Sequence, residues 1–401
     1  MTLSRKKFLQ ISSLASASFM VPGFLKSFAA TTPASGSSKK LIILQLSGGN
    51  DGLNTVIPFR NDIYRSARPG IGLKNEDILG LTDEIGLNHS LKGFKNLLDQ
   101  SSLSIINGVG YDRPNRSHFR SMDIWQSASS SEDIVTTGWI GRYLDQSCPD
   151  CNTHNSLAIE VDDSLSLSMK GLRHSALAIR DPQQFYNAAK APFLTAIADP
   201  SHNLEHGNGL PDFLRKTLRE TISSAEYVNE HFNSGKPKQT YPDTAIGKRM
   251  KTIASLLLSN ADTQVYYASH GSFDTHVGQR GRQDKLLAEL DDAISAFVLE
   301  MKAAGLFNDV LIMTFSEFGR RVSENGSGGT DHGTAAPMFF ISGSLKKPGI
   351  YNPIPDLSDL DDGDLKHSID FRQTYSSVLS DWLKTDPDRI LKSPSPGLAL
   401  F

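Results

Sequence analysis

The sequence predicts an α/β fold in which a mostly parallel central sheet carries helices on both faces. Short apolar runs such as "LIILQL" (41–46) and "DVLIMT" (309–314) are typical of buried central strands. Between such runs lie segments with the apolar spacing of helices, and several runs end in glycine-rich turns. Strands that alternate with helices form parallel sheets covered on both sides.

The N-terminal residues differ from the rest of the chain. Residues 1–30 have a basic start, an apolar stretch and the small-residue triplet Ser27-Phe28-Ala29, which predicts an export signal peptide. The stretch "SRKKFLQ" resembles a twin-arginine signal, with Lys6 in place of the second arginine. Residues 31–40 read as a polar tether. We therefore expect a periplasmic or extracellular protein without a membrane span once the signal is removed.

The remaining residues, 41–401, are expected to form a single domain with a less regular insertion at about 129–240. Pro114 and Asn115 are expected to start a helix, as both are common at helix starts. The other expected strands cover 102–110, 263–270 and 338–343, and the other expected helices cover 89–100, 212–232, 250–260, 282–305 and 371–384.

Composition excludes one class of function. The chain has 41 Lys and Arg against 44 Asp and Glu, a net charge of -3, so we expect no nucleic-acid partner. The two cysteines, Cys148 and Cys151, favour a short-loop disulfide in an exported protein. A redox role for this Cys-x-x-Cys is the alternative, and a zinc ribbon is excluded because a second cysteine pair is missing.

Polar residues collect where the expected strands end, and ligands of open α/β sheets bind beyond the carboxyl ends of strands. Carboxylates mixed with imidazoles suit zinc, manganese or iron. Residues two apart in an extended loop point the same way, so Asp274 and His276 can hold one ion together. A hydrogen-bonded network without metal is the alternative. The residues concerned are Asn50, Asp51, Arg116, Ser117, His118, His270, Asp274, His276, Glu317, Arg320, Arg321, Asp331 and His332.

The order of these groups resembles the alkaline phosphatase/sulfatase superfamily. More closely, a set of motifs spread over residues 40–385 resembles one family of exported bacterial proteins of uncharacterised function within that superfamily. These motifs are "LSGGNDGLN", "NRSHFRSMDIW", "FDTH", "FSEFGRRV", "GTDHGTAAPMF" and "DFRQTYSSVLSDWL".

The resemblance implies a metal site of one or two divalent ions, with zinc favoured over manganese or another ion. Asp51 would match the metal aspartate of the first strand, Asp274 and His276 the pair of the other metal, and His332 that site's late histidine. Glu317 stands where the superfamily has Asp-His, so one imidazole of a two-metal site is missing.

The resemblance also suggests catalytic residues. Ser117, at an expected helix start, would be the nucleophile, although the helix-capping role is equally compatible with its position. His118 and Arg116 would bind an anionic group or face solvent. Arg320 would neutralise the ester oxygens or pair with nearby acids. Asn50, His270 and Asp331 would either hold the metal ligands in place or contact the substrate. Asp331 would orient His332 or serve as a further ligand.

The leading hypothesis is an exported metal-dependent hydrolase of phosphate or sulfate esters, acting on an anionic small molecule or a glycan. A non-catalytic exported binding protein that keeps the fold and a metal site is the first alternative. A transferase of phosphoryl-bearing headgroups is the second.

Overall fold

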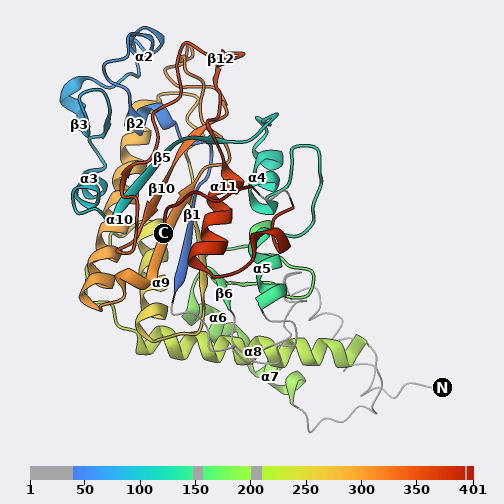
Figure 1. Cartoon of the computed structure of the whole chain (residues 1–401). Coiled ribbons are helices and arrows are strands. Elements are labelled where there is room, and N and C mark those ends of the chain that lie inside the picture. Colours follow the sequence, from blue (N-terminus) through green and yellow to red (C-terminus); the bar gives the residue numbers. More distant parts are fainter. Residues whose placement is uncertain (1–38, 148–156, 200–209, 393–394) are drawn as a thin grey trace.

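The computed structural model describes residues 39–147, 157–199, 210–392 and 395–401. A nine-stranded sheet forms its centre, with strands in the order β11-β5-β10-β9-β1-β8-β6-β7 and β14 beside β5 (Figure 1). The predicted signal peptide, most of the tether, and Cys148 and Cys151 lie outside the described residues, so the expectations about them stay predictions.

The sheet is mostly parallel, which confirms the predicted α/β class. Strand β10 runs antiparallel to both of its neighbours, β5 and β9, and all other pairs in the sheet are parallel. The reversal follows from the connection between β9 and β10, which is a loop and not a crossover helix. Both ends of that loop therefore lie at one edge of the sheet. The strands are β1 (Lys40–Leu46), β5 (Leu103–Gly110), β6 (Ala158–Glu160), β7 (Leu177–Ala178), β8 (Val265–His270), β9 (Val310–Phe315), β10 (Ala336–Ile341), β11 (Gly349–Ile350) and β14 (Ile369–Asp370).

Helices cover both faces of the sheet, as expected (Figure 1). In β1, Ile42 and Leu44 face a core shared with α3, α9 and α10, while Leu41 and Ile43 face a core shared with α4, α5 and α11. This alternation is the two-residue period of a strand buried on both sides. The helices are α3 (Lys92–Asp99), α4 (His118–Ser127), α5 (Trp139–Ser147), α9 (Ala245–Leu258), α10 (Gln279–Ala303) and α11 (Phe371–Ser377), the last continued by a π-helical turn, Val378–Trp382.

The stretch expected to be irregular, 129–240, contributes to the sheet. Its strands β6 and β7 extend the sheet beyond β8, and α8 lies beside α6, α7 and α9. Two small sheets, β2-β4-β3 and β12-β13, lie off the central one. No helix of the described residues is long and apolar enough to cross a membrane. These remaining elements are α2 (Asp62–Ala67), α6 (Pro182–Ala189), α7 (Pro192–Ala198), α8 (Leu210–Ser234), β2 (Val56–Ile57), β3 (Ile78–Gly80), β4 (Gly86–Asn88), β12 (Leu360–Asp361) and β13 (Asp364–Leu365).

Helix α4 begins later than predicted, at His118 and not at Pro114. Ser117 is the N-cap residue, with extended backbone (φ -84°, ψ 126°). The Asn115 side chain accepts a hydrogen bond from the Ser117 amide at 2.9 Å, which forms a turn before the helix. Asn115 therefore initiates a turn, and the helix proper starts after it.

Candidate metal centre

The predicted strand-end residues lie at one edge of the sheet. Residues 47–51 follow β1, 116–118 follow β5, 271–276 follow β8 and 316–321 follow β9, while 331–332 precede the antiparallel β10. Because β10 runs opposite to the others, its start meets their carboxyl ends. The topology thus gathers five loops that are far apart in the sequence.

Three histidines and one aspartate form a cluster at this edge, which we name the histidine–aspartate cluster (His118, Asp274, His276 and His332). Oδ1 of Asp274 lies 3.0 Å from Nε2 of His276 and 3.1 Å from Nε2 of His332. Oδ2 of the same carboxylate lies 3.6 Å from Nε2 of His118. Ligand atoms of His118, Asp274 and His332 all lie within 4.8 Å of one another.

The other nitrogen of each imidazole faces an oxygen. Nδ1 of His332 donates to the Arg116 carbonyl at 2.8 Å, and because a carbonyl only accepts, this nitrogen carries the proton. Nδ1 of His118 lies 2.9 Å from Oε1 of Glu317, and Nδ1 of His276 lies 3.4 Å from Oδ1 of Asp331. An oxygen partner on Nδ1 is what fixes a metal-binding histidine with the Nε2 lone pair turned inward.

The charges around Asp274 keep it ionised. Burial raises the pKa of Asp274, but the hydrogen bond from Arg320 and the positive charge of its guanidinium outweigh burial and lower the pKa to about 2. Burial lowers the pKa of His332, which favours its neutral form. The hydrogen bond with Glu317 raises the pKa of His118 above its ordinary value. The cluster thus combines an ionised carboxylate with a neutral imidazole.

Glu317 supports the cluster from a fully buried position. Its Oε1 accepts from His118 and, at 2.8 Å, from the amide of Gly48. Its Oε2 is buried without a hydrogen-bond partner among the described residues. An unpaired buried carboxylate oxygen is costly, so this atom fits a position next to a cation. The contacts therefore give Glu317 a supporting role and leave one oxygen for the predicted ligand role.

The contacts of Arg320 do not support the predicted catalytic role. Its guanidinium is buried and donates to the backbone carbonyls of Gly48, Gly49, Phe273 and Thr330. It also donates to Asp274 at 2.7 Å. Because the guanidinium already donates to these partners, it cannot reorient toward a bound ester. Arg320 instead ties the loops after β1, β8 and β9 together and positions Asp274.

The side-chain contacts of Asp51 are with residues outside the histidine–aspartate cluster. It forms an ion pair of 2.6 Å with Arg68, and both side chains are 0% exposed. The same oxygen of Asp51 accepts from Gln279, and Oδ1 accepts from the Leu53 amide at 3.1 Å. The predicted role as metal aspartate gains no support from these contacts. Arg68 was absent from the prediction, because nothing in its sequence neighbourhood signals a partner 17 residues earlier.

The predicted supporting residues divide into two groups. Asp331 faces His276 and not His332, so its contact fits an orienting role toward a different histidine from the predicted one. Arg116 contributes its carbonyl to His332, while its side chain pairs with Asp364 at 2.7 Å. His270 points elsewhere, with Nε2 2.9 Å from the Leu286 carbonyl. The side chain of Asn50 accepts from Thr55 and Gln283, also outside the cluster.

The Ser117 hydroxyl makes no hydrogen bond within the part of the chain that the structure describes. Although Ser117 occupies the N-cap position of α4, its side chain makes no capping hydrogen bond. The residue is exposed and directly precedes His118. Ser117 is therefore the N-cap residue by its backbone position, but its hydroxyl does not cap the helix.

The turn after β1 requires glycine. Gly48 and Gly49 have φ values of +115° and +77°. A Cβ on Gly48 would lie 2.4 Å from the Asp274 amide nitrogen, and one on Gly49 would lie 2.4 Å from the Phe318 ring. Only glycine allows both the positive φ and these close approaches. The turn thus fills the space between the loops that carry Asp274 and Glu317.

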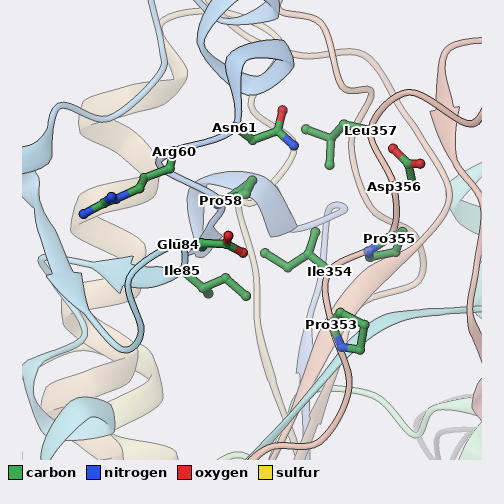
Figure 2. A pocket seen from close by; sticks show the side chains of 10 residues that line it. All are labelled: Pro58, Arg60, Asn61, Glu84, Ile85, Pro353, Ile354, Pro355, Asp356 and Leu357. Carbon is green, nitrogen blue, oxygen red and sulfur yellow. The ribbon is translucent and has the colours of Figure 1, made fainter.

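A separate cavity of about 290 Å³ lies near the small sheet β2-β4-β3. Figure 2 shows the side chains around it, with Pro58 on one side and Pro353 and Pro355 on the other. None of the predicted site residues is among the described residues that line this cavity. It is therefore distinct from the candidate metal centre.

The fold and the cluster define an α/β protein with a candidate metal centre at the carboxyl edge of its sheet. The chain belongs to the family described as "Protein of unknown function (DUF1501)", whose model matches residues 38–381. This agrees with the predicted family of uncharacterised proteins. No curated protein matches the chain.

Several solved structures resemble the chain weakly in fold. The C-terminal periplasmic domain of EptC from Escherichia coli in complex with Zn has a TM-score of 0.39 and 12% identity, over 94% of this chain and 95% of that one. The PsFucS1 sulfatase from Pseudoalteromonas sp. has a TM-score of 0.35 and 11% identity, over 99% and 78%. The lipoteichoic acid synthase LtaP from Listeria monocytogenes has a TM-score of 0.34 and 10% identity, over 82% and 71%. Likenesses at this level assign no activity to the chain.

Proposed function

We propose that this protein is an exported hydrolase of phosphate or sulfate esters that depends on a divalent metal ion, with zinc as the best fit. One observation carries the proposal. The Nε2 atoms of three imidazoles lie around one ionised carboxylate, Asp274, while each Nδ1 faces an oxygen.

The donor set fits a metal ion. His118, His276, His332 and Asp274 would hold it, with Oε2 of Glu317 as a further oxygen beside it. Imidazole nitrogen and carboxylate oxygen are usual zinc ligands, and a majority of imidazoles favours zinc over manganese. The contacts of Asp51 with Arg68 favour one ion over two.

A bound ion would supply Lewis-acid polarisation of the ester and a lowered pKa of water or of a hydroxyl. The residues of the chain would bind the substrate and provide the nucleophile. The N-terminus of α4 offers free backbone amides and the positive end of the helix dipole to an anionic ester group. Ser117, an exposed residue at this point whose side chain does not cap the helix, is the candidate nucleophile. The overall reaction adds the oxygen of water to phosphorus or sulfur and releases the alcohol.

The experiment combines metal binding with turnover. Zinc is titrated by calorimetry into the metal-free protein, and para-nitrophenyl phosphate, bis-(para-nitrophenyl) phosphate and para-nitrophenyl sulfate are tested as substrates. We expect zinc to bind, one of these substrates to be hydrolysed, and Ser117→Ala to reduce the rate by at least about 100-fold, as for removal of a nucleophile. Ser66→Ala, at an exposed serine of α2, is the matched control.

Other results would select other functions. Zinc binding without turnover of any substrate would support a non-catalytic binding protein. Transfer of the phosphoryl group to added glycerol in preference to water would support a transferase. Absence of binding for zinc and for manganese would refute the metal centre itself.

A further inference from the structure

A polar cavity of about 300 Å³ opens at the same edge of the sheet, between the ends of β1, β6 and β8 and helix α4. It lies next to the candidate metal centre along two segments. Phe119 on its wall directly follows His118, and Ser47 directly precedes Gly48, whose amide bonds Glu317. The lining residues are Gln45, Ser47, Phe119, Met122, Asp123, Gln126, Glu160, Asp162, Ser164, Ser166, Tyr267 and Ser269.

We propose that this cavity binds a neutral polyhydroxylated group, such as a sugar ring, through Gln45, Gln126 and Glu160. The inference rests on the proposed function in one respect, because in an ester substrate this group would be the alcohol part. The binding itself does not require turnover.

An unpartnered donor points to a ligand. Gln45 is 4% exposed and lines the cavity, and its Nε2 has no hydrogen-bond partner among the described residues. Its Oε1 is occupied, because it accepts from the Tyr267 hydroxyl and, at 3.4 Å, from Gln126. Leaving a buried amide donor unpaired is costly. A ligand hydroxyl in the cavity would accept this hydrogen bond.

The charges of the cavity favour a neutral ligand. Asp162 is paired with Arg249 at 2.7 Å, and its other oxygen accepts from Ser269. Burial raises the pKa of Glu160 to about 8, so at neutral pH this group holds a proton and both donates and accepts. Asp123 is exposed. No lysine or arginine is among the described lining residues, so the cavity suits hydroxyl groups better than a phosphate group.

An exposed aromatic ring completes the surface. Phe119 is 82% exposed, although it lines the cavity. An apolar ring beside convergent polar groups offers a face for the C–H side of a sugar while the polar groups fix its orientation.

The test measures binding directly. Saturation-transfer NMR is recorded on the full protein with methyl α-glucopyranoside and methyl β-galactopyranoside, and with choline and 2-phenylethanol at equal concentration. We expect transfer to at least one glycoside and little to choline or 2-phenylethanol. Stronger transfer to choline than to either glycoside, or no transfer to the glycosides, would overturn the inference.

Variants locate the binding. Gln45→Met removes the unpartnered donor at nearly constant volume, and Phe119→Ala changes an exposed ring, so that loss of folding does not explain its effect. Each is expected to reduce the glycoside signal at least about threefold. Phe193→Ala, at a ring of α7 that is 52% exposed, is the matched control and should leave the signal unchanged. Equal signals in Phe119→Ala and Phe193→Ala would contradict the assignment to this cavity.

The two proposals fail separately. Glycoside binding is repeated with His332→Ala, which changes the histidine–aspartate cluster and not the cavity lining. Glycoside binding should persist in this variant. If the wild-type protein binds the glycosides but neither zinc nor manganese, the proposed function fails and this inference stands. Zinc binding and ester turnover without glycoside binding would refute this inference and leave the proposed function standing.

Discussion

The Nε2 atoms of His276 and His332 lie 3.0 Å apart, and both approach the same oxygen of Asp274. Because the Nδ1 of His332 carries the proton that bonds the Arg116 carbonyl, its Nε2 presents a lone pair to the other imidazole. Two imidazole nitrogens in this geometry are stabilised when a cation or a proton stands between them and the carboxylate. This relationship underlies the first prediction.

Removing His332 should weaken zinc binding strongly. His332→Ala deletes one imidazole ligand and frees the Arg116 carbonyl, so we expect zinc affinity to fall at least about 100-fold. Calorimetric titration of the metal-free protein gives the measurement. His174→Ala, at a histidine outside the cluster, serves as control. Unchanged affinity in His332→Ala would exclude this residue as a ligand.

Glu317→Gln tests whether the Glu317 carboxylate holds the His118 ring in place. The amide keeps the size of the side chain but removes the charge that the Nδ1 of His118 faces. The pKa of His118 in the metal-free protein should therefore fall, and zinc affinity should drop by about 10- to 100-fold. NMR titration of the ring protons gives the pKa. A drop in affinity with an unchanged His118 pKa would instead indicate that Glu317 acts only through its free oxygen.

Asp51→Asn should damage stability more than metal binding. It leaves Arg68 buried without its charge partner, and breaking a buried ion pair costs about 3–5 kcal/mol. Urea unfolding measures the loss, and the zinc stoichiometry of the folded variant should equal that of the wild type. Asp99→Asn, in the exposed pair with Lys95, should cost less than about 1 kcal/mol. If the variant loses zinc binding but keeps its stability, Asp51 is a metal ligand after all.

Glu160 should make stability fall as pH rises. Its pKa is about 8 in the folded protein against an ordinary value of 4.5, so between these values the folded state binds more protons than the unfolded state. The free energy of unfolding then decreases with pH, by at most about 1.4 kcal/mol per pH unit. Glu160→Gln should flatten this dependence in urea unfolding at pH 6 and pH 8. Glu76→Gln, at an exposed side chain, should keep the wild-type dependence.

Strand ends could be predicted from the sequence, and with them the loops of the site. Apolar runs fix where β1, β8 and β9 lie, and the polar residues after them have no other edge to occupy. His118, Asp274, His276 and His332 were therefore predicted as neighbours, and the structure brings them together. The sequence also predicted helix α4, although with a start at Pro114, four residues too early.

The direction of each polar side chain could not be predicted. Asp51 and Arg320 follow strands just as Asp274 does, and His270 ends β8. Packing between loops nevertheless turns Asp51 toward Arg68, His270 toward the Leu286 carbonyl and Arg320 toward backbone carbonyls. Whether a strand-end group faces an open site or another loop depends on contacts between distant segments. Glu160 escaped prediction for the same reason, because its polar neighbours Gln45 and Gln126 come from other elements.

Arg320 donates hydrogen bonds to four backbone carbonyls and to Asp274, and these bonds bear on the order in which the chain folds and the metal binds. The loops after β1, β8 and β9 are held by the chain's own buried cation, so the ligand positions are set when the polypeptide folds. Uptake of the proposed metal ion would then need no rearrangement of the loops, so the ion could bind after the chain has folded. In such a protein, folding and activation by the metal would be separate events.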